Sequence, residues 1–242
     1  MTQPHSLIIS DLHLAESHAE TNALFFKFLT DKAAFAEKLY ILGDFFEFWL
    51  GDDDNAPLNQ QVIAALKKLH LSGTEIFIMH GNRDFLLGAQ FFSASQSIFL
   101  KDPTVLELYG HKLLLLHGDS LCTDDLKYQR YRRVVNLWLV QKWFLSRSLK
   151  KRHAMAVKLR NSNPHKDKNY QPRNDISDVN ANAVLKAFRK HKVKTMIHGH
   201  THRLGIHYYD DGEKVRYVLG DWHQKGSYIE VSEEAIRLHE WP

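Results

Sequence analysis

The most regular feature of this sequence is a short apolar run that recurs five times and leads each time into a polar turn. The runs lack polar alternation, which is typical of strands buried on both faces of a sheet. Glycine or a polar turn follows each run, and then acids or histidines. The five segments are SLIISDLH (6–13), KLYILGD (38–44), EIFIMHGNRD (75–84), KLLLLHGD (112–119) and KTMIHGHTH (194–202).

Helical periodicity separates several of these runs, at about residues 19–36, 59–72 and 178–191. Ser177 or Asp178 is a candidate N-cap for the last helix, because both side chains can accept hydrogen bonds from free helical N–H groups. Residues 217–231 predict two further strands around a turn. Strands that alternate with helices indicate an α/β fold.

Residues 121–175 follow a different pattern. From Asp125 to Arg160 the chain has neither proline nor glycine, and its periodicity is helical. An apolar stripe lies among arginines and lysines and consists of Val134, Leu137, Trp138, Leu139, Trp143 and Phe144. The segment 161–175 is polar and contains proline, which predicts a loop. We therefore expect a core of residues 1–120 and 176–242, with residues 121–175 inserted as a helical cap.

The distribution of charge also separates residues 121–175 from the rest of the chain. The segment 121–175 has 14 Lys and Arg against 4 Asp and Glu, a net charge of +10. The whole chain has 32 against 28, so the remainder has 18 against 24, a net charge of −6. Two regions of opposite charge indicate two tasks, and the cap is the part suited to an anionic partner.

Composition limits the classes of protein that need to be considered. A chain of 242 residues with 44% hydrophobic and 25% charged residues is typical of a globular protein. Its apolar runs are far shorter than the ~18 residues of a membrane span, and the start lacks the pattern of a signal peptide. Cys122 is the only cysteine, which excludes an internal disulfide and fits a reducing compartment. We expect a cytoplasmic protein.

Candidate metal ligands gather at the ends of the apolar runs. They are Asp11, His13, Asp44, Asn82, His117, His200 and His202. Each motif alone is weak, because a turn aspartate or a core histidine is usually structural. Strand ends of an open α/β sheet meet in one crevice, however, and seven donors suit two ions that share a bridging aspartate. Imidazole and carboxylate donors without cysteine favour Mn²⁺, Fe or Zn²⁺ over Ca²⁺ or Mg²⁺.

The motifs D-x-H, G-D, G-N-R-D, H-G-D and G-H-x-H occur in this order between residues 8 and 202, and in this the chain resembles the calcineurin-like metallophosphoesterase superfamily. Four longer stretches are similar to one family within it, the pyrophosphohydrolases that act on UDP-2,3-diacylglucosamine in lipid A biosynthesis. These stretches are ILGDFFEFWLGDDD, HGNRDFLLG, LHGDSLCTDD and IHGHTHR. The resemblance implies a four-layer α-β-β-α sandwich and two Mn²⁺ ions per chain.

The resemblance also implies which ligands hold which ion. The first ion would be held by Asp11, His13, Asp44 and His202, and the second by Asp44, Asn82, His117 and His200, with Asp44 bridging. The expected products are UMP and 2,3-diacylglucosamine 1-phosphate (lipid X). We expect attack of metal-bound hydroxide on the α-phosphorus, with Asn82, Arg83 and His117 as catalytic residues.

Arg83 stands where most members of the superfamily have histidine. Histidine can protonate a departing alkoxide, whereas arginine keeps its proton below pH ~12 and instead binds phosphate oxygens with two donors. A pyrophosphate releases a phosphate monoester, whose second pKa is about 6, so the leaving group needs no proton. Arg83 therefore favours a diphosphate substrate. The alternative is a structural salt bridge from Arg83 to Asp84 or Asp119.

Two rival functions are weighed. One is a phosphodiesterase acting on nucleic acid or a soluble nucleotide, since basic and aromatic residues suit single strands. Against it, Arg83 is no acid for an alkoxide leaving group, and the cap has many large aliphatic residues. The other is a non-catalytic metal-bound scaffold, which the presence of all seven expected donors argues against.

The amphipathic basic cap predicts contact with lipid. A pair of such helices can lie on an anionic membrane and accept acyl chains, or alternatively its apolar stripe packs on the core. We expect a monomer, peripheral on the cytoplasmic face of the inner membrane, with no nucleic-acid partner. The candidate substrate contacts are Asn82, Arg83, Asp125, Arg160, Asn163, Lys166 and His200. We expect structural roles for Cys122, His80, His111, His198 and His223.

Overall fold

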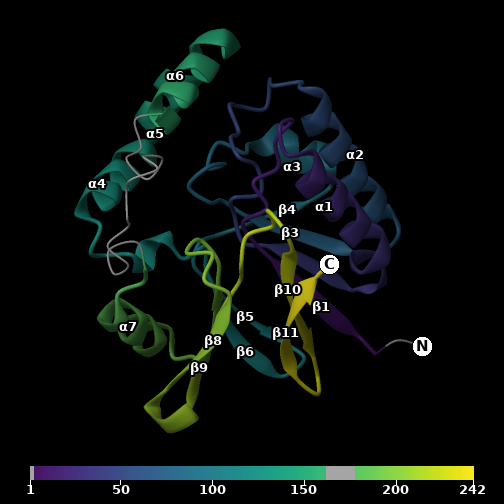
Figure 1. Ribbon diagram of the computed structural model, residues 1–242, viewed down its shortest axis with the longest axis vertical. Coiled ribbons are helices and arrows are strands. Elements are labelled where there is room, and N and C mark those ends of the chain that lie inside the picture. The colour runs from purple at the N-terminus through teal and green to yellow at the C-terminus, as the bar shows by residue number, and fades with distance from the viewer. Residues whose placement is uncertain (1–2, 162–177) are drawn as a thin grey trace.

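The computed structural model of the protein describes residues 3–161 and 178–242, with the backbone alone at residues 159–161 (Figure 1). Two sheets form its centre. The first has six strands in the order β11-β10-β1-β2-β3-β4, and the second has five in the order β5-β6-β7-β9-β8. Strands β1 to β4 are parallel to one another, and so are β6, β7 and β9. The remaining pairings are antiparallel.

The strands of the first sheet are β1 (His5–Ile9), β2 (Lys38–Ile41), β3 (Glu75–Met79), β4 (Ile98–Leu100), β10 (Gly226–Ser232) and β11 (Ile236–Trp241). Those of the second are β5 (Thr104–Leu108), β6 (His111–Leu115), β7 (Thr195–His198), β8 (Gly205–Tyr209) and β9 (Lys214–Val218). All five apolar runs of the sequence form strands, as predicted. The two strands predicted in 217–231 are β9 and β10, which lie in different sheets.

Four helices cover the outer faces of the sheets: α1 (Ala19–Asp31), α2 (Pro57–Leu71), α3 (Ala89–Ser95) and α7 (Ala181–His191). In β1, Leu7 and Ile9 share a core cluster with Phe25 of α1, while Ile8 between them faces a cluster shared with Leu115 of the second sheet. A third cluster joins the second sheet to α7, for example through Met196 and Phe188.

These three clusters separate four layers, α-β-β-α, which confirms the predicted fold. The central strands are buried on both faces because each alternate residue enters a different cluster. Each fully buried Leu or Ile side chain contributes about 1.5–3 kcal/mol of hydrophobic free energy. The layers therefore supply a stable frame for the loops at the strand ends.

Three further helices lie outside the sheets, and we call them the cap helices: α4 (Leu126–Val135), α5 (Trp138–Leu145) and α6 (Leu149–Asn161). They follow one another along one side of the molecule (Figure 1). The sequence predicted a pair, which is wrong, because the helix is interrupted at 136–137 and at 146–148. The boundaries of the inserted cap at 121 and 175 stay a prediction, since residues 162–177 lie outside the described part.

The apolar stripe of the cap helices does not pack on the core. The side chains of Val134, Leu137, Trp138, Leu139 and Trp143 are each at least 50% exposed. Among the described residues, no helix is long and apolar enough to cross a membrane.

The start of α7 differs from the predicted one. The N-cap is Asn180, whose side chain accepts a hydrogen bond from Ala183 N at 3.1 Å. Asp178 instead accepts from Val179 N and pairs with Arg203. Ser177, the other candidate, lies outside the described residues.

Candidate metal centre

All seven candidate ligands lie just beyond the carboxyl ends of five strands. Asp11 and His13 follow β1, Asp44 follows β2 and Asn82 follows β3, all in the first sheet. In the second sheet, His117 follows β6, and His200 and His202 follow β7. Because the strands of each set are parallel, their ends meet at one edge of each sheet, and the stacked sheets bring the two edges together.

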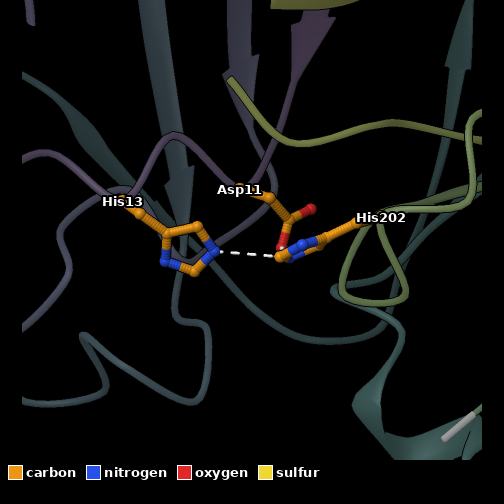
Figure 2. Close-up of side chains that lie close together, drawn as sticks. All are labelled: Asp11, His13 and His202. Carbon is orange, nitrogen blue, oxygen red and sulfur yellow. Dashed lines mark hydrogen bonds and ion pairs between the residues drawn. The ribbon is translucent and has the colours of Figure 1, made fainter. Parts of the chain in front are cut away.

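Asp11, His13 and His202 form the first group. One possible ligand atom from each lies within 4.8 Å of the others. Figure 2 shows the carboxylate and the two imidazole rings pointing toward one another. His13 Nε2 lies 3.3 Å from His202 Nε2, which in turn lies 3.4 Å from Asp11 Oδ1. Three donors that converge in this way can enclose a cation.

Asp44, His117 and His200 form the second group, again with atoms within 4.8 Å of one another. Asn82 joins it, since its Oδ1 lies 3.0 Å from His117 Nε2. Asp44 lies between the groups, with Oδ1 3.7 Å from His117 Nε2 and Oδ2 3.9 Å from His13 Nε2. The structure therefore brings all seven predicted residues together, with Asp44 next to both groups.

Backbone groups orient several of these side chains. His117 Nδ1 donates to the Leu42 carbonyl at 2.9 Å, which leaves Nε2 directed at Asp44. Asp11 Oδ2 accepts from His200 N at 2.8 Å, and Asp44 Oδ1 accepts from Arg83 N at 2.8 Å. Outer partners of this kind fix the orientation of ligands in metal sites. The donor set thus fits a metal in its chemistry as well as in its spacing.

Two acidic residues that contact the candidate ligands were not predicted from the sequence. Asp221 Oδ2 lies 3.1 Å from His202 Nδ1, and Glu47 Oε2 lies 3.5 Å from His13 Nδ1. A carboxylate behind a metal-binding imidazole raises its basicity. Asp221 follows a glycine at the end of an apolar run, as Asp44 does. This shared pattern in the sequence could have identified Asp221 as a residue of the site.

The backbone at the ligands is unusual. Asp11, His13, Asp44, His200 and His202 all have positive φ, between 48° and 66°. Few residues other than glycine adopt this left-handed region, and such residues cluster at functional sites. Glycine at position 199 allows the turn after β7 to lie close to Asp11, because a Cβ at that position would overlap Asp11 Oδ2.

Burial and charge push the pKa values of the imidazoles apart. Burial lowers the pKa of His13 to about 3 and, together with the charge of His117, that of His200 to about 4. Burial would also lower the pKa of His202, but the carboxylates of Asp11 and Asp221 outweigh it and raise the pKa to about 10. A cation bound at the first group must therefore displace a proton from His202 at neutral pH.

Arg83 borders the site with a side chain that is 35% exposed. Its Nη1 lies 3.3 Å from Glu47 Oε1, and its Nε lies 4.0 Å from Asp44 Oδ2. The predicted alternative of a salt bridge to Asp84 or Asp119 is wrong. Asp84 accepts hydrogen bonds from the N–H groups of Phe45, Phe46 and Gly81, and Asp119 pairs with Arg132.

The predicted substrate contacts in the cap are only partly described. Asp125 is the N-cap of α4 and accepts from Tyr128 N at 2.9 Å, which gives it a structural role. Asn163, Lys166 and the side chain of Arg160 lie outside the described residues.

The residues expected to be structural make ordinary internal contacts. His198 is buried, and its ring lies within hydrogen-bonding distance of the Gly199 carbonyl and Arg216. His80 and His111 bond to backbone carbonyls. Cys122 is buried, which raises the pKa of its thiol to about 12. His223 is the exception, since its ring stacks on His13 with centroids 6.2 Å apart.

Residues 5–204 match the profile of the calcineurin-like phosphoesterases, so the chain belongs to this class of metallophosphoesterases. Among solved structures, a dimetal phosphatase from Danio rerio is similar with a TM-score of 0.56 over 99% of this chain and 96% of that chain. At 15% sequence identity, this similarity shows a shared fold.

Similarity to known proteins identifies one family within this class. The chain is 46% identical to UDP-2,3-diacylglucosamine hydrolase from Serratia proteamaculans (strain 568), over 98% of this chain and 99% of that protein. It is 47% identical to the protein of the same name from Marinobacter nauticus (strain ATCC 700491 / DSM 11845 / VT8), over 98% of both chains. The protein is a member of the UDP-2,3-diacylglucosamine hydrolase family.

Proposed function

We propose that this protein hydrolyses the pyrophosphate bond of UDP-2,3-diacylglucosamine in lipid A biosynthesis and releases UMP and 2,3-diacylglucosamine 1-phosphate. The observation that carries the proposal is the identity of 46–47% to relatives of that name over 98% of the chain. A match of this extent includes the cap helices as well as the two sheets. The nucleic-acid phosphodiesterase that the sequence left as an alternative is not favoured by these relatives.

Two Mn²⁺ ions are our proposal for the metal centre. Asp11, His13, Asp44 and His202 would hold one, and Asp44, Asn82, His117 and His200 the other. A pair of such ions would polarise a water into a nucleophile and neutralise phosphate oxygens. The position of Asp44 between the two groups supports its role as the shared ligand, and a donor set of imidazoles and carboxylates suits Mn²⁺.

The protein's own side chains would then bind and orient the diphosphate. The guanidinium of Arg83 is exposed enough to donate to phosphate oxygens, and it is held at the site by Glu47. Asn82 is neutral, so it adds no repulsion to an anionic substrate. The leaving sugar phosphate needs no proton, which is consistent with an arginine rather than an acid at position 83.

We further propose that the cap helices receive the acyl chains and hold the protein at the cytoplasmic face of the inner membrane. Exposed Trp138, Leu139 and Trp143 lie among Arg133, Lys142 and Arg147. Large apolar side chains next to cations are the combination that binds anionic lipid surfaces.

Phosphorus-31 NMR of the products tests the proposed function. With Mn²⁺ and detergent, we expect UMP and the lipid 1-phosphate from UDP-2,3-diacylglucosamine and no cleavage of an oligonucleotide. EDTA should abolish turnover, and added Mn²⁺ should restore it. In ¹⁸O-water the label should enter UMP if attack is at the α-phosphorus. Cleavage of the oligonucleotide without cleavage of the lipid would overturn the proposal.

A further inference from the structure

Two arginines, one on α4 and one on α6, join the cap helices to loops of both sheets. At the α4 end, Arg132 Nε donates to Asp119 Oδ2 at 2.6 Å, and Asp119 follows β6 of the second sheet. On α6, Arg152 donates to the Leu50 carbonyl and to both carboxylate oxygens of Asp53. Leu50 and Asp53 lie in the loop that follows β2 of the first sheet. The cap helices thus contact a loop of each sheet, and both loops follow strands whose ends carry candidate ligands.

Arg152 is distinct from the other residues of the cap helices. Between residues 126 and 158 it is the only side chain that the structure places in the interior, with 2% exposure, whereas Lys150, Lys151 and His153 beside it are exposed. Burying a guanidinium is unfavourable unless its donors are satisfied. Here Nε donates to the Arg147 carbonyl at 3.0 Å, and the remaining contacts go to Leu50 and Asp53.

The loop that receives Arg152 is shaped for this contact. Gly51 has a φ of 130°, and a Cβ at this position would collide with Arg152 Nη1 and Leu145 Cδ2. A residue with a side chain would therefore displace α6 or the loop.

The same loop also contacts the candidate site. Trp49 N donates to the Arg83 carbonyl at 3.3 Å, one residue before Leu50. Asp52 accepts from Trp49 Nε1 at 3.0 Å and from Gly88 N at 2.9 Å, which fixes the loop to the segment that follows Arg83. Residues 49–53 therefore form a continuous connection: Leu50 and Asp53 contact Arg152 of α6, and Trp49 contacts the backbone of Arg83.

We infer that Arg152 is a positioning residue, which fixes the cap helices to the first sheet and holds their exposed apolar face at a set distance from the metal centre. This inference rests on the proposed function, because that distance matters only for a substrate with both acyl chains and a diphosphate. A substrate without acyl chains would not use the apolar face of the cap helices. Loss of the contact should thus impair binding of the lipid substrate and spare the chemistry.

Kinetics of Arg152→Gln and Asp53→Asn on UDP-2,3-diacylglucosamine test this role. We expect KM to rise roughly tenfold in either variant while kcat changes less than about twofold, the pattern of lost substrate binding. The double variant should be no worse than Arg152→Gln alone, because both changes break one contact. Lys151→Gln is the matched control, since it removes an exposed cation from the same helix, and it should leave KM unchanged.

A second measurement keeps the test decisive if Arg152→Gln is poorly folded. Hydrogen–deuterium exchange of Asp53→Asn, whose substituted side chain is 63% exposed, should accelerate in α6 and in the loop 50–54 but not in β6 or α7. Unchanged KM and unchanged exchange in folded Asp53→Asn would overturn the inference. Failure of the wild-type protein to cleave the lipid nucleotide would instead overturn the proposed function.

Discussion

The candidate metal centre and the cap helices differ in the burial of their side chains and in the contacts that hold them. At the centre the ligands are largely buried, with Asp11 at 0% and His117 at 1% exposure, and backbone hydrogen bonds fix their orientation. On the cap helices the large apolar side chains are exposed, and polar side chains, among them Arg132 and Arg152, contact the loops at the strand ends. The two regions therefore depend on different forces. The layers of the core hold the centre in place, whereas side-chain contacts such as those of Arg132 and Arg152 hold the cap helices.

This comparison predicts that substitutions at the centre impair chemistry and that those on the cap impair binding. His117→Ala should show the largest effect. We expect kcat to fall on the order of 100-fold or more, because a candidate metal ligand that also neighbours Asp44 is lost. Far-UV circular dichroism should stay unchanged, since the core clusters do not include His117. His191→Ala, on α7, is the control, and normal turnover by His117→Ala would refute the ligand assignment.

Arg83→Lys should show an intermediate effect. Lysine keeps the charge but loses the two-pronged donor geometry, so kcat/KM for the lipid nucleotide should fall roughly 10- to 100-fold. Arg83→His is the informative comparison, because it places at this position a side chain that can donate a proton to a leaving group. We expect no recovery on the diphosphate and better retention of activity on an alkyl phosphodiester than in Arg83→Lys. A fully active Arg83→His enzyme on the diphosphate would contradict the leaving-group argument.

Trp138→Ala should show the smallest effect, confined to the lipid. The ring is 66% exposed, so the free energy of unfolding should change by less than ~0.5 kcal/mol. Loss of the aromatic surface should raise KM and weaken binding to anionic vesicles, each by about three- to tenfold. Leu71→Ala is the matched control, because Leu71 is 74% exposed and lies on α2, away from the cap helices. Equal vesicle binding by both variants would show that the cap is not the membrane contact.

The core and the ligand set could be predicted because the signals are local. An apolar run followed by glycine and an acid or histidine specifies a buried strand and its end, and parallel strands bring such ends to one edge. Asp11, Asp44 and His117 were therefore predictable as members of one set, although each motif alone was weak.

Features that depend on tertiary contacts could not be predicted in this way. Arg152 lies in the run KKRH, where four basic residues look alike, and its burial depends on contacts with the distant residues Leu50, Gly51 and Asp53. The interruption of the cap helices at 136–137 contains neither glycine nor proline. Asn180 replaced Asp178 as the cap of α7 because Asp178 pairs with Arg203, a residue distant in the sequence.

The left-handed backbone at the candidate ligands lowers the stability that the fold can reach. Each such residue other than glycine costs about 1–3 kcal/mol, and Asp11, His13, Asp44, His200 and His202 all adopt it. Glycine at any of these positions would relieve the backbone strain, but it would also remove a candidate metal ligand. The strain at these five positions is therefore a loss of folding free energy that accompanies the placement of the candidate ligands.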